Sequence, residues 1–398
     1  MLEISEVFNA ARVLGAVARH TPLVAAPKLN PEADVWIKSE NLQLTGSFKL
    51  RGAYYKLSQL TDDEKARGVI ACSAGNHAQG VALGATHNGI KSIICLPEGA
   101  PISKIEATKG YGAEVCLVKG VYDDAYAKAI ELQKEHGYTF VHPFDDEKVI
   151  AGQGTIGLEI LNDMPDVEAV IVPVGGGGLI SGVAFAIKSL NPDVKVYGVQ
   201  ADGAASMVGS LKEGKRIHLE QVGTIADGIS VKEPGELTFD LCTRYVDEIV
   251  TVSDEETAAA ILTLMENNKV VAEGAGAVSV AAAMFNKVPI KGKKVVCIVS
   301  GGNIDVNMVN RIIMRGLAKS GRIYNFEISL NDKPGQLERV CSVVAHLGAN
   351  VLRVNHERLR GAAGFNDCVL EIELETRNNS HIDSIRKGLQ ESGFKVLN

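Results

Sequence analysis

The 398-residue sequence lacks several features that mark specialised classes of protein. Its seven cysteines stand singly, without Cys-x-x-Cys or Cys/His pairs, which argues against zinc and disulfide frameworks and for a reducing compartment. The net charge of -7 gives no indication of nucleic-acid binding. No apolar run approaches the roughly 20 residues that span a bilayer, and the N-terminal segment, with Glu3 and Glu6, has no signal-peptide core. We therefore expect a cytoplasmic protein that binds neither membrane nor nucleic acid.

Short apolar runs alternate with helical patterns through most of the chain, which predicts an α/β fold of parallel sheets covered on both faces. The strands fall into two groups that are separated near residues 141–154. We expect two lobes, a smaller one at about 45–145 inserted in a larger one, with a ligand between them near the strand C-termini. The predicted strands are 35–38, 68–73, 92–97, 114–118, 169–174, 194–200 and 294–302, and the predicted helices include 77–89, 122–137 and 255–268.

The pattern changes after Arg322. Residues 323–359 read as strand, helix and strand, and residues 365–398 as strand, helix and short strand. This βαββαβ order predicts a separate ferredoxin-like domain at 323–398, joined through residues 319–322 to a first region at 1–318.

Consecutive glycines in VGGGGL (174–179) follow an apolar strand and precede a helix. Their backbone N–H groups and the helix N-terminus would form a site for a phosphate, whereas the alternative is a merely flexible turn. A second glycine pattern, Gly152 to Gly157, formally matches the dinucleotide-binding motif. It follows a charged stretch instead of a buried strand, so we do not expect it to bind NAD.

Lys49 lies in ENLQLTGSFKLRGA (40–53), where a helix is predicted to begin with Thr45 and Ser47 as N-caps and to continue to Leu60. A helix N-terminus disfavours a cation. The simplest alternative is a solvent-exposed lysine.

Three more turns end predicted strands and carry polar groups. ACSAGNHAQG (71–80) could hold a carboxylate at its helix N-terminus, with Asn76 offering an amide, and we expect His77 to make only a local hydrogen bond. VVAEGAGAVS (270–279) places Glu273 before a small-residue turn, and IVSGGN (298–303) ends a strand with Ser300. In a parallel sheet the last two would face the same crevice.

The motifs SFKLRGA, SAGNHAQG, GGGGL, ADG (226–228), EGAGA and SGGN occur in the order and spacing of the fold type II pyridoxal-phosphate enzymes. Over roughly residues 5–316 the chain most resembles the threonine dehydratases, also called threonine ammonia-lyases. Its C-terminal segment resembles an ACT domain, a regulatory unit of many amino-acid enzymes.

This resemblance implies a cofactor, pyridoxal 5'-phosphate (PLP), and a role for each matching residue. Lys49 would be the Schiff-base lysine, which agrees with the lowered pKa of an amine at a helix N-terminus. The turn Ser73–His77 would bind the substrate carboxylate. The other cofactor-binding positions would be Phe48, Asn76, Gly175, Gly176, Gly177, Gly178, Leu179, Glu273 and Ser300, with Ser300 at the ring nitrogen and Phe48 packing on the ring or serving only as core.

The implied reaction converts L-threonine to 2-oxobutanoate and ammonia, with L-serine giving pyruvate. Serine racemases carry a second serine where this chain has Ala74, which can neither give nor take a proton. They also have a divalent-metal site, but its acidic positions are matched here by Gln200 and Ser206, so we expect no metal there. A monovalent cation remains open, as do a serine-preferring dehydratase or racemase and a non-catalytic amino-acid sensor.

In the ACT-like segment, the resemblance points to Asp332, Gly335 and Asn350 as places where an amino-acid or nucleotide effector binds at a domain interface. The alternative is a unit that only dimerises. Isoleucine inhibition would indicate a biosynthetic enzyme, and ADP or AMP activation a catabolic one. The family implies a homo-oligomer, a tetramer.

Overall fold

The computed structural model describes residues 2–358 and 367–398, which form two compact units, Met1–Ile304 and Asp305–Asn398. The division falls before the predicted linker at 319–322, because helix α13 (Val306–Lys319) contacts strand β11 (Ile323–Asn331) of the second unit. The ends of two predicted segments, at residue 359 and at residues 365–366, lie outside the described residues. Among the residues described, no helix is long and apolar enough to cross a membrane.

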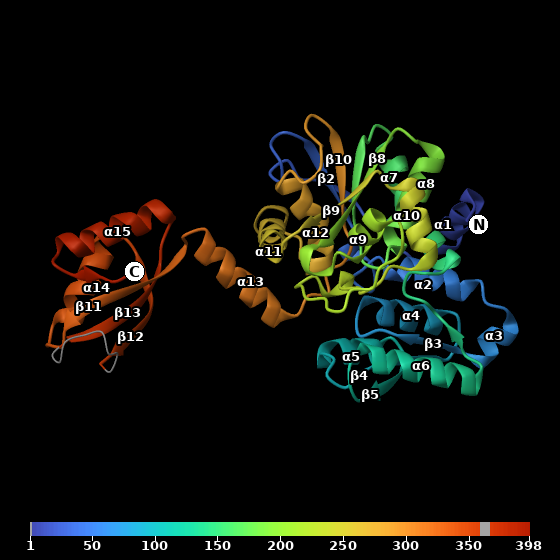
Figure 1. Ribbon diagram of the computed structural model, residues 1–398, viewed down its shortest axis with the longest axis horizontal. Coiled ribbons are helices and arrows are strands. Elements are labelled where there is room, and N and C mark those ends of the chain that lie inside the picture. The colour runs from blue at the N-terminus through green and yellow to red at the C-terminus, as the bar shows by residue number, and fades with distance from the viewer. Residues whose placement is uncertain (1, 359–366) are drawn as a thin grey trace. The chain divides into compact units, whose positions relative to one another are not determined.

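The first unit contains two sheets in separate lobes (Figure 1). The larger sheet has the order β1-β2-β10-β7-β8-β9, and only β1 is antiparallel to its neighbour. Apolar, β-branched runs form its central strands and are buried on both faces, as the sequence predicts. The strands are β1 (Leu23–Ala25), β2 (Asp34–Ser39), β7 (Ala169–Pro173), β8 (Lys195–Ala201), β9 (Glu248–Val252) and β10 (Lys294–Val299).

The smaller sheet is wholly parallel and has the order β5-β4-β3-β6. Its strands are β3 (Val69–Cys72), β4 (Ser92–Pro97), β5 (Glu114–Val118) and β6 (Thr139–Phe140), all within the range expected for the smaller lobe. Ile94 and Leu96 of β4 are among the buried core residues that it shares with α4.

Helices cover these sheets, and several begin directly after a strand, as α4 does after β3. The α-helices of the first unit are α1 (Ile4–Leu14), α2 (Lys49–Ser58), α3 (Asp62–Arg67), α4 (Asn76–His87), α5 (Ile102–Gly110), α6 (Tyr122–His136), α7 (Glu147–Asp163), α8 (Gly178–Leu190), α9 (Ser206–Glu213), α10 (Glu236–Tyr245), α11 (Asp254–Thr263) and α12 (Gly274–Met284). Short 3-10 turns lie at η1 (Glu40–Leu42), η2 (Asp202–Ala204) and η3 (Asp227–Ile229), and the π-helical turn η4 (Leu264–Asn268) ends the segment predicted as one helix over 255–268.

Helix α2 lies between the two lobes, packed against α4 on one side and α7 on the other (Figure 1). Glycines allow the backbones to approach closely: a Cβ added at Gly152 of α7 would lie 2.7 Å from the Arg51 carbonyl oxygen and from the Gly52 Cα. A Cβ at Gly80 of α4 would lie 3.0 Å from the Lys49 carbonyl oxygen. Side chains at these positions would push α2 away from its neighbours.

A buried ionic cluster also holds α2. Arg51 is 1% exposed; its Nη2 lies 2.8 Å from Oε1 of the fully buried Glu40, and its Nη1 lies 2.5 Å from Oε1 of Glu159. Lys38, also fully buried, lies 2.7 Å from Glu159 through its Nζ. These contacts tie α2 to β2, η1 and α7, which carry the partner residues.

The start of α2 differs from the sequence prediction. The residue at the N-cap position is Phe48, and no side chain caps the first turn among the residues described, so Thr45 and Ser47 were wrongly predicted as caps. Ser47 instead pairs with Gly301 in an isolated β-bridge. The helix ends at Ser58, two residues before the predicted end.

The second unit has a ferredoxin-like sheet of order β12-β13-β11-β14, antiparallel throughout. With β11, its strands are β12 (Asn350–Glu357), β13 (Asp367–Glu375) and β14 (Lys395–Val396). Helices α14 (Gln336–His346) and α15 (Asn379–Glu391) cover one face, where Phe326, Ile328 and Leu370 form part of the core. The predicted βαββαβ order is confirmed.

The buried cluster around Arg51 yields a prediction about stability. We expect Arg51→Met to lower the free energy of unfolding by about 3–5 kcal/mol, because the buried Glu40 carboxylate would keep its charge without its cationic partner and Glu159 would keep only Lys38. Arg244→Met is the matched control, since Arg244 forms an exposed pair with Asp240 of the same helix and should cost at most about 0.5 kcal/mol. Denaturant unfolding of both variants measures the difference. Equal losses would show that the buried cluster does not hold α2.

Candidate active site

Lys49 is the first residue of α2, and it is partly buried. Its Nζ donates a hydrogen bond to the Pro143 carbonyl oxygen at 2.7 Å and lies 5.3 Å from the centre of the Phe48 ring. Burial lowers the pKa of Lys49 to about 8, although the Glu273 carboxylate acts in the opposite direction. The amine is therefore far more often neutral near pH 7–8 than an exposed lysine, so the solvent-exposed alternative is wrong.

The segment 141–144, which connects β6 to α7, reaches three parts of this site. The Val141 carbonyl oxygen accepts a hydrogen bond from His77 Nε2 at 2.8 Å, and the Pro143 carbonyl accepts the bond from Lys49. The Phe144 ring packs against the glycine loop. None of these contacts was predicted, because carbonyl acceptors leave no signature in a sequence.

The glycine loop Gly175–Gly178 leads from β7 into α8, as predicted. Close packing requires its glycines: a Cβ at Gly176 would lie 2.5 Å from the Phe144 ring, and one at Gly178 would lie 2.8 Å from the Phe144 Cα. Gly177 has φ +98°, a left-handed conformation that favours glycine. In the described part of the chain, no side chain caps the first turn of α8, so its N–H groups can bind an anion.

Asn76 and Asn303, both partly buried, form a network with the buried Glu273 near the lysine. Asn76 Nδ2 donates to Glu273 Oε1 at 2.6 Å, and Asn303 Nδ2 donates to Asn76 Oδ1 at 2.8 Å and to the Thr45 carbonyl oxygen at 2.8 Å. Burial and the Asp227 carboxylate raise the pKa of Glu273 to about 7, while the Asn76 hydrogen bond acts in the opposite direction. The sequence analysis quoted Asn303 within SGGN but gave it no role.

Ser300 directly follows β10 and is 2% exposed. Its Oγ donates a 3.3 Å hydrogen bond to the Ala275 carbonyl oxygen in the first turn of α12. Glu273 and Ser300 come from adjacent turns, since the Glu273 N–H donates to the Gly301 carbonyl oxygen at 3.1 Å.

The turn Ser73–His77 leads from β3 into α4, and no side chain caps this helix among the residues described. Ser73 Oγ accepts from the Gly75 N–H at 3.2 Å. A Cβ built on Gly75 would meet nothing within 4 Å, so there is open space beside the turn. Ala74 packs against the core of the smaller lobe. A carboxylate can therefore approach the first turn of α4.

His77 differs from its prediction, because its hydrogen bond reaches across the lobe to Val141 and is not local. Its Nδ1 is buried, and no partner is found for it in the part of the chain that is described. Burial and the positive charge of Lys49 lower the pKa of His77 to about 3, so the ring is neutral. Because Nε2 carries the proton that it donates to Val141, Nδ1 is left as an acceptor.

The second glycine pattern lies inside α7 and not at a strand-to-helix turn. Gly152 packs on α2, and a Cβ at Gly154 would lie 2.9 Å from the Gly182 carbonyl oxygen of α8. These glycines therefore allow α7 to pack closely against α2 and α8. Their spacing matches the dinucleotide-binding motif without the strand-to-helix turn that the motif requires.

Gln200 and Ser206, at the place where racemases have metal ligands, are both buried. Gln200 Oε1 accepts from the Val208 N–H at 2.9 Å, and Ser206 Oγ donates to the Val231 carbonyl oxygen at 2.8 Å. Both oxygens are thus engaged within the protein.

The three predicted effector residues do not meet within one chain. Asn350 pairs with Glu375, which pairs with Ile323 at the start of β11, whereas Asp332 follows the end of β11. At about 3.4 Å per residue, the two side chains lie at opposite ends of the sheet, about 30 Å apart. Gly335, with φ +85° at the N-cap of α14, belongs to the Asp332 end.

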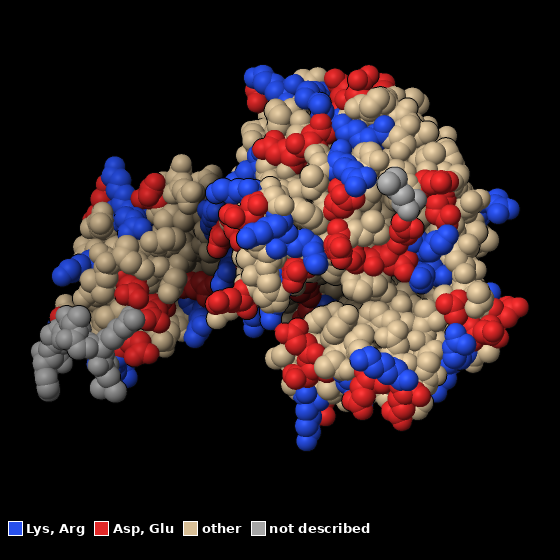
Figure 2. Space-filling view, turned by 45° about the vertical axis from the view of Figure 1, so that its right-hand side comes forward, with Lys and Arg blue, Asp and Glu red and all other residues tan. Residues whose placement is uncertain are grey.

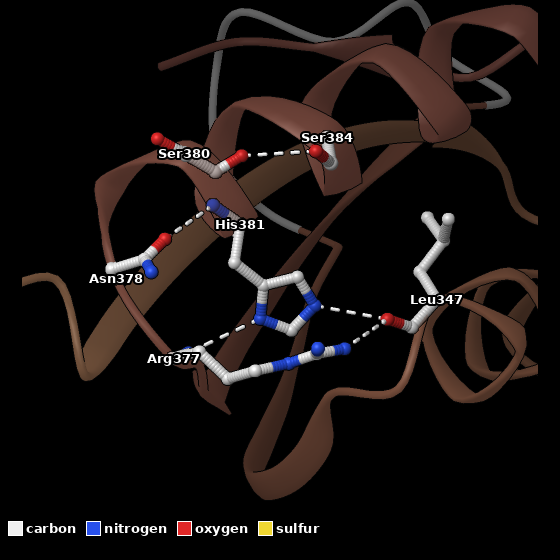
Figure 3. Close-up of a pocket in the computed structure, with 6 residues that line it drawn as sticks. All are labelled: Leu347, Arg377, Asn378, Ser380, His381 and Ser384. Carbon is white, nitrogen blue, oxygen red and sulfur yellow. Dashed lines mark hydrogen bonds between the residues drawn. The ribbon is translucent and has the colours of Figure 1, made fainter.

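A cavity of about 310 Å³ lies at the Asn350 end (Figure 3). The Leu347 carbonyl oxygen accepts hydrogen bonds from His381 Nε2 at 2.9 Å and from Arg377 Nη2 at 3.4 Å, which join the end of α14 to the start of α15. The cavity is lined by Leu347, Arg377, Asn378, Ser380, His381 and Ser384.

The geometry of the first unit fits PLP. The structure brings together an amine with a lowered pKa, the bare N-terminus of α8, a buried hydroxyl and a partly buried amide, which are those of Lys49, Gly178, Ser300 and Asn76. These groups match an aldehyde, a phosphate and a ring with polar atoms at its edge.

Comparisons with known proteins agree. A family model described as "Pyridoxal-phosphate dependent enzyme" matches residues 16–301. The chain is 52% identical over 398 residues to the L-threonine ammonia-lyase of Thermotoga maritima, covering 100% of this chain and 99% of that protein. It is 45% identical over 362 residues to the L-threonine ammonia-lyase of Geobacter sulfurreducens, covering 91% and 90%.

Among solved structures, the processed form of threonine deaminase isoform 2 from Solanum lycopersicum has a TM-score of 0.73 and 40% identity, covering 78% of this chain and 94% of that one. Maize serine racemase has a TM-score of 0.75 and 33% identity, covering 80% and 98%. The backbone is thus equally close to a deaminase and a racemase, and side chains must distinguish the reactions. The match over residues 16–301, the near-complete alignment with relatives and the site geometry lead to one conclusion: this chain belongs to the family of pyridoxal-phosphate dependent enzymes.

Proposed function

We propose that this protein is a threonine ammonia-lyase, which converts L-threonine to 2-oxobutanoate and ammonia, with L-serine giving pyruvate as a secondary activity. The observation that carries the proposal is the 52% identity, over both units of the chain, to a protein named L-threonine ammonia-lyase. The geometry around Lys49 supports it, because the reaction needs an amine that is neutral near physiological pH.

PLP would be held by residues that the two lobes bring together. Lys49 would bond to it covalently, the N–H groups from Gly175 to Leu179 would bind its phosphate, and Phe48 would pack beside its ring. Asn76, positioned by Glu273 and Asn303, would contact the ring oxygen. When bound, the cofactor withdraws electrons from the α-carbon of the substrate. Ser300 would contact the ring nitrogen, and a hydroxyl stabilises a charged ring less than an aspartate would, which favours prompt elimination.

The substrate carboxylate would lie at the turn Ser73–His77, against the bare first turn of α4. Lys49 Nζ would accept the proton from the substrate α-carbon. An equivalent proton would be given to the β-hydroxyl, which would leave as water. The enamine would then take up water and yield the keto acid and ammonium. Because the His77 ring is neutral, it does not oppose the protonation of Lys49 in the first of these steps.

A racemase is the alternative that the fold likeness alone would allow. Racemisation needs a second proton donor on the opposite face of the substrate, and Ala74, at the matching position, has only a methyl group. Gln200 and Ser206 likewise offer no charged oxygen for a divalent cation. We therefore propose a lyase without racemase activity and without a divalent metal at residues 198–206.

The second unit would be an ACT regulatory domain. Because Asp332 and Gly335 lie about 30 Å from Asn350 in one chain, an effector that contacts both places would require a second copy of the domain. This requirement supports a homo-oligomer, for which we propose a tetramer. The effector would be an amino acid or a nucleotide, and isoleucine inhibition would mark a biosynthetic enzyme.

The partners would otherwise be small molecules. Acidic and basic side chains are interspersed on the face seen in Figure 2, as expected for a protein of net charge -7 without a nucleic-acid partner. All seven cysteines are free thiols, which supports a reducing, cytoplasmic location.

The first test is keto-acid release by the PLP-loaded protein. We expect 2-oxobutanoate from L-threonine, pyruvate from L-serine and no D-serine. Lys49→Ala should lower turnover by at least about 100-fold, since it removes the base. The control is Lys109→Ala, which removes an exposed lysine paired with Glu106 and should leave turnover unchanged. Cofactor-loaded protein without keto-acid release would contradict the proposal.

The pKa of Lys49 predicts how cofactor capture depends on pH. Only the neutral amine reacts, so the rate at which the apoprotein captures PLP should rise with pH around a midpoint near 8. Glu273→Gln removes a negative charge that favours the protonated amine, so the midpoint should move to lower pH. Stopped-flow absorbance measures the rate. The control is Glu255→Gln, at an exposed position of α11, and a shift of equal size there would refute the assignment.

The glycine loop gives a prediction about cofactor affinity. Gly178→Ala should raise the dissociation constant of PLP at least tenfold, about 1.4 kcal/mol, because the methyl group would displace Phe144 or the first turn of α8. Gly99→Ala is the control, since a Cβ there would meet nothing within 4 Å. Equilibrium titration of apoprotein provides the constants, and unchanged binding in Gly178→Ala would place the phosphate elsewhere.

A further inference from the structure

A histidine, a cysteine and an aspartate meet at one end of the sheet in the second unit. Asp332 follows β11, His356 lies near the end of β12, and Cys368 lies near the start of β13. One side-chain donor atom from each of the three lies within 4.8 Å of the other two. His356 Nε2 lies 2.8 Å from Cys368 Sγ.

The strand register explains why these side chains converge. Cys368 pairs with Leu330 and His356 pairs with Leu370, and directly paired residues of antiparallel strands point to the same face. Leu330, Leu370 and Cys368 are all buried beneath the helices, so His356 points to that same face. Asp332 directly follows the end of β11, two residues after Leu330. The three donors thus belong to the fold of the sheet and not to a chance surface contact.

We propose that Asp332, His356 and Cys368 form a binding site for a divalent transition metal of the zinc type. A thiolate, an imidazole and a carboxylate are the donors that zinc takes, and the sulfur disfavours the hard cations Mg²⁺ and Ca²⁺. Three protein ligands leave a fourth position of the tetrahedron for water. The inference goes beyond the proposed function, which gives His356 and Cys368 no role and uses Asp332 only as a contact for an effector.

Burial and the carboxylates of Asp332 and Asp367 raise the pKa of Cys368, so the free protein holds the thiol protonated. A metal would displace this proton, and the two negative ligands would then offset the charge of the cation. In tetrahedral zinc sites the ligand bond lengths place nitrogen and sulfur about 3.5 Å apart. His356 would therefore move outward by somewhat under 1 Å, and its place on an edge strand allows this.

Arg358 is the competing cation. Its Nε lies 2.8 Å from Asp332 Oδ2, and its Nη2 lies 3.5 Å from Oδ1. The Arg358 side chain is 66% exposed, so it can release one oxygen at little cost. The Asp332 carboxylate can thus bind the metal through Oδ1 while Oδ2 stays near the arginine.

Isothermal titration of the full-length, PLP-loaded protein with zinc tests the proposal. We expect one zinc ion per chain and release of a proton in buffers of different ionisation enthalpy. Cys368→Ser and His356→Gln should each weaken binding by at least about 100-fold. Cys341→Ser is the matched control, because Cys341 is another free thiol of the same unit, and it should bind as the wild type does.

A cobalt(II) titration separates this site from weak binding elsewhere. Tetrahedral cobalt with a thiolate ligand gives intense visible absorption, which should appear in the wild type and in Cys341→Ser but be lost in Cys368→Ser and strongly reduced in His356→Gln. Keto-acid release should be retained in all variants without added metal, which shows that they are folded. Zinc binding that is absent in the wild type, or that is equal in all four proteins, would overturn the proposal.

Discussion

The close approach of three helices at α2 is the constraint on which the first unit depends. Gly152 of α7 allows its backbone to contact Arg51 and Gly52, and Gly80 of α4 allows contact with Lys49 itself. Because Lys49 is the first residue of this tightly packed helix, the position of its backbone is set by helix contacts and not by a flexible loop. Catalytic groups displaced by about 1 Å can lose about 100-fold in rate, so rigid placement has a direct chemical value.

Two opposing electrostatic effects set the protonation of this lysine. Burial at the start of α2 disfavours the charged form, while the Glu273 carboxylate favours it, and burial dominates. Glu273 is itself raised to a pKa of about 7, so the two groups titrate near each other. The pair therefore leaves the amine able to take and release a proton close to neutral pH, where an exposed lysine would stay charged.

Much of the fold could be predicted from local patterns, because buried parallel strands are continuous apolar runs. Strands 92–97 and 114–118 match their predicted bounds, and the βαββαβ order after Arg322 is confirmed. Lys49 and the glycine loop could also be recognised locally. A cation is disfavoured at a helix start, and consecutive glycines are costly in an ordinary turn. What could not be predicted depends on residues far apart: Asn76 and Glu273 are 197 positions apart, and His77 bonds to Val141 instead of to its neighbours. The Asn350 and Asp332 motifs matched one family pattern, yet only the strand register shows that they lie at opposite ends.

The segment from Val141 to Phe144 has a consequence for protein engineering. It holds the lysine and the histidine through two carbonyl groups and packs its phenyl ring on the glycine loop. Exchanging the smaller lobe with that of a relative is one way to change substrate choice, since the lobe carries the Ser73–His77 turn that we propose as the site of the substrate carboxylate. A junction placed at the end of β6 would join a foreign lobe to the native segment and mismatch two contacts, those of Lys49 with Pro143 and of His77 with Val141. A junction after Phe144 would transfer the lobe together with the segment that its lysine and histidine contact. Only the contact between the glycine loop and the incoming side chain at position 144 would then need to be adapted.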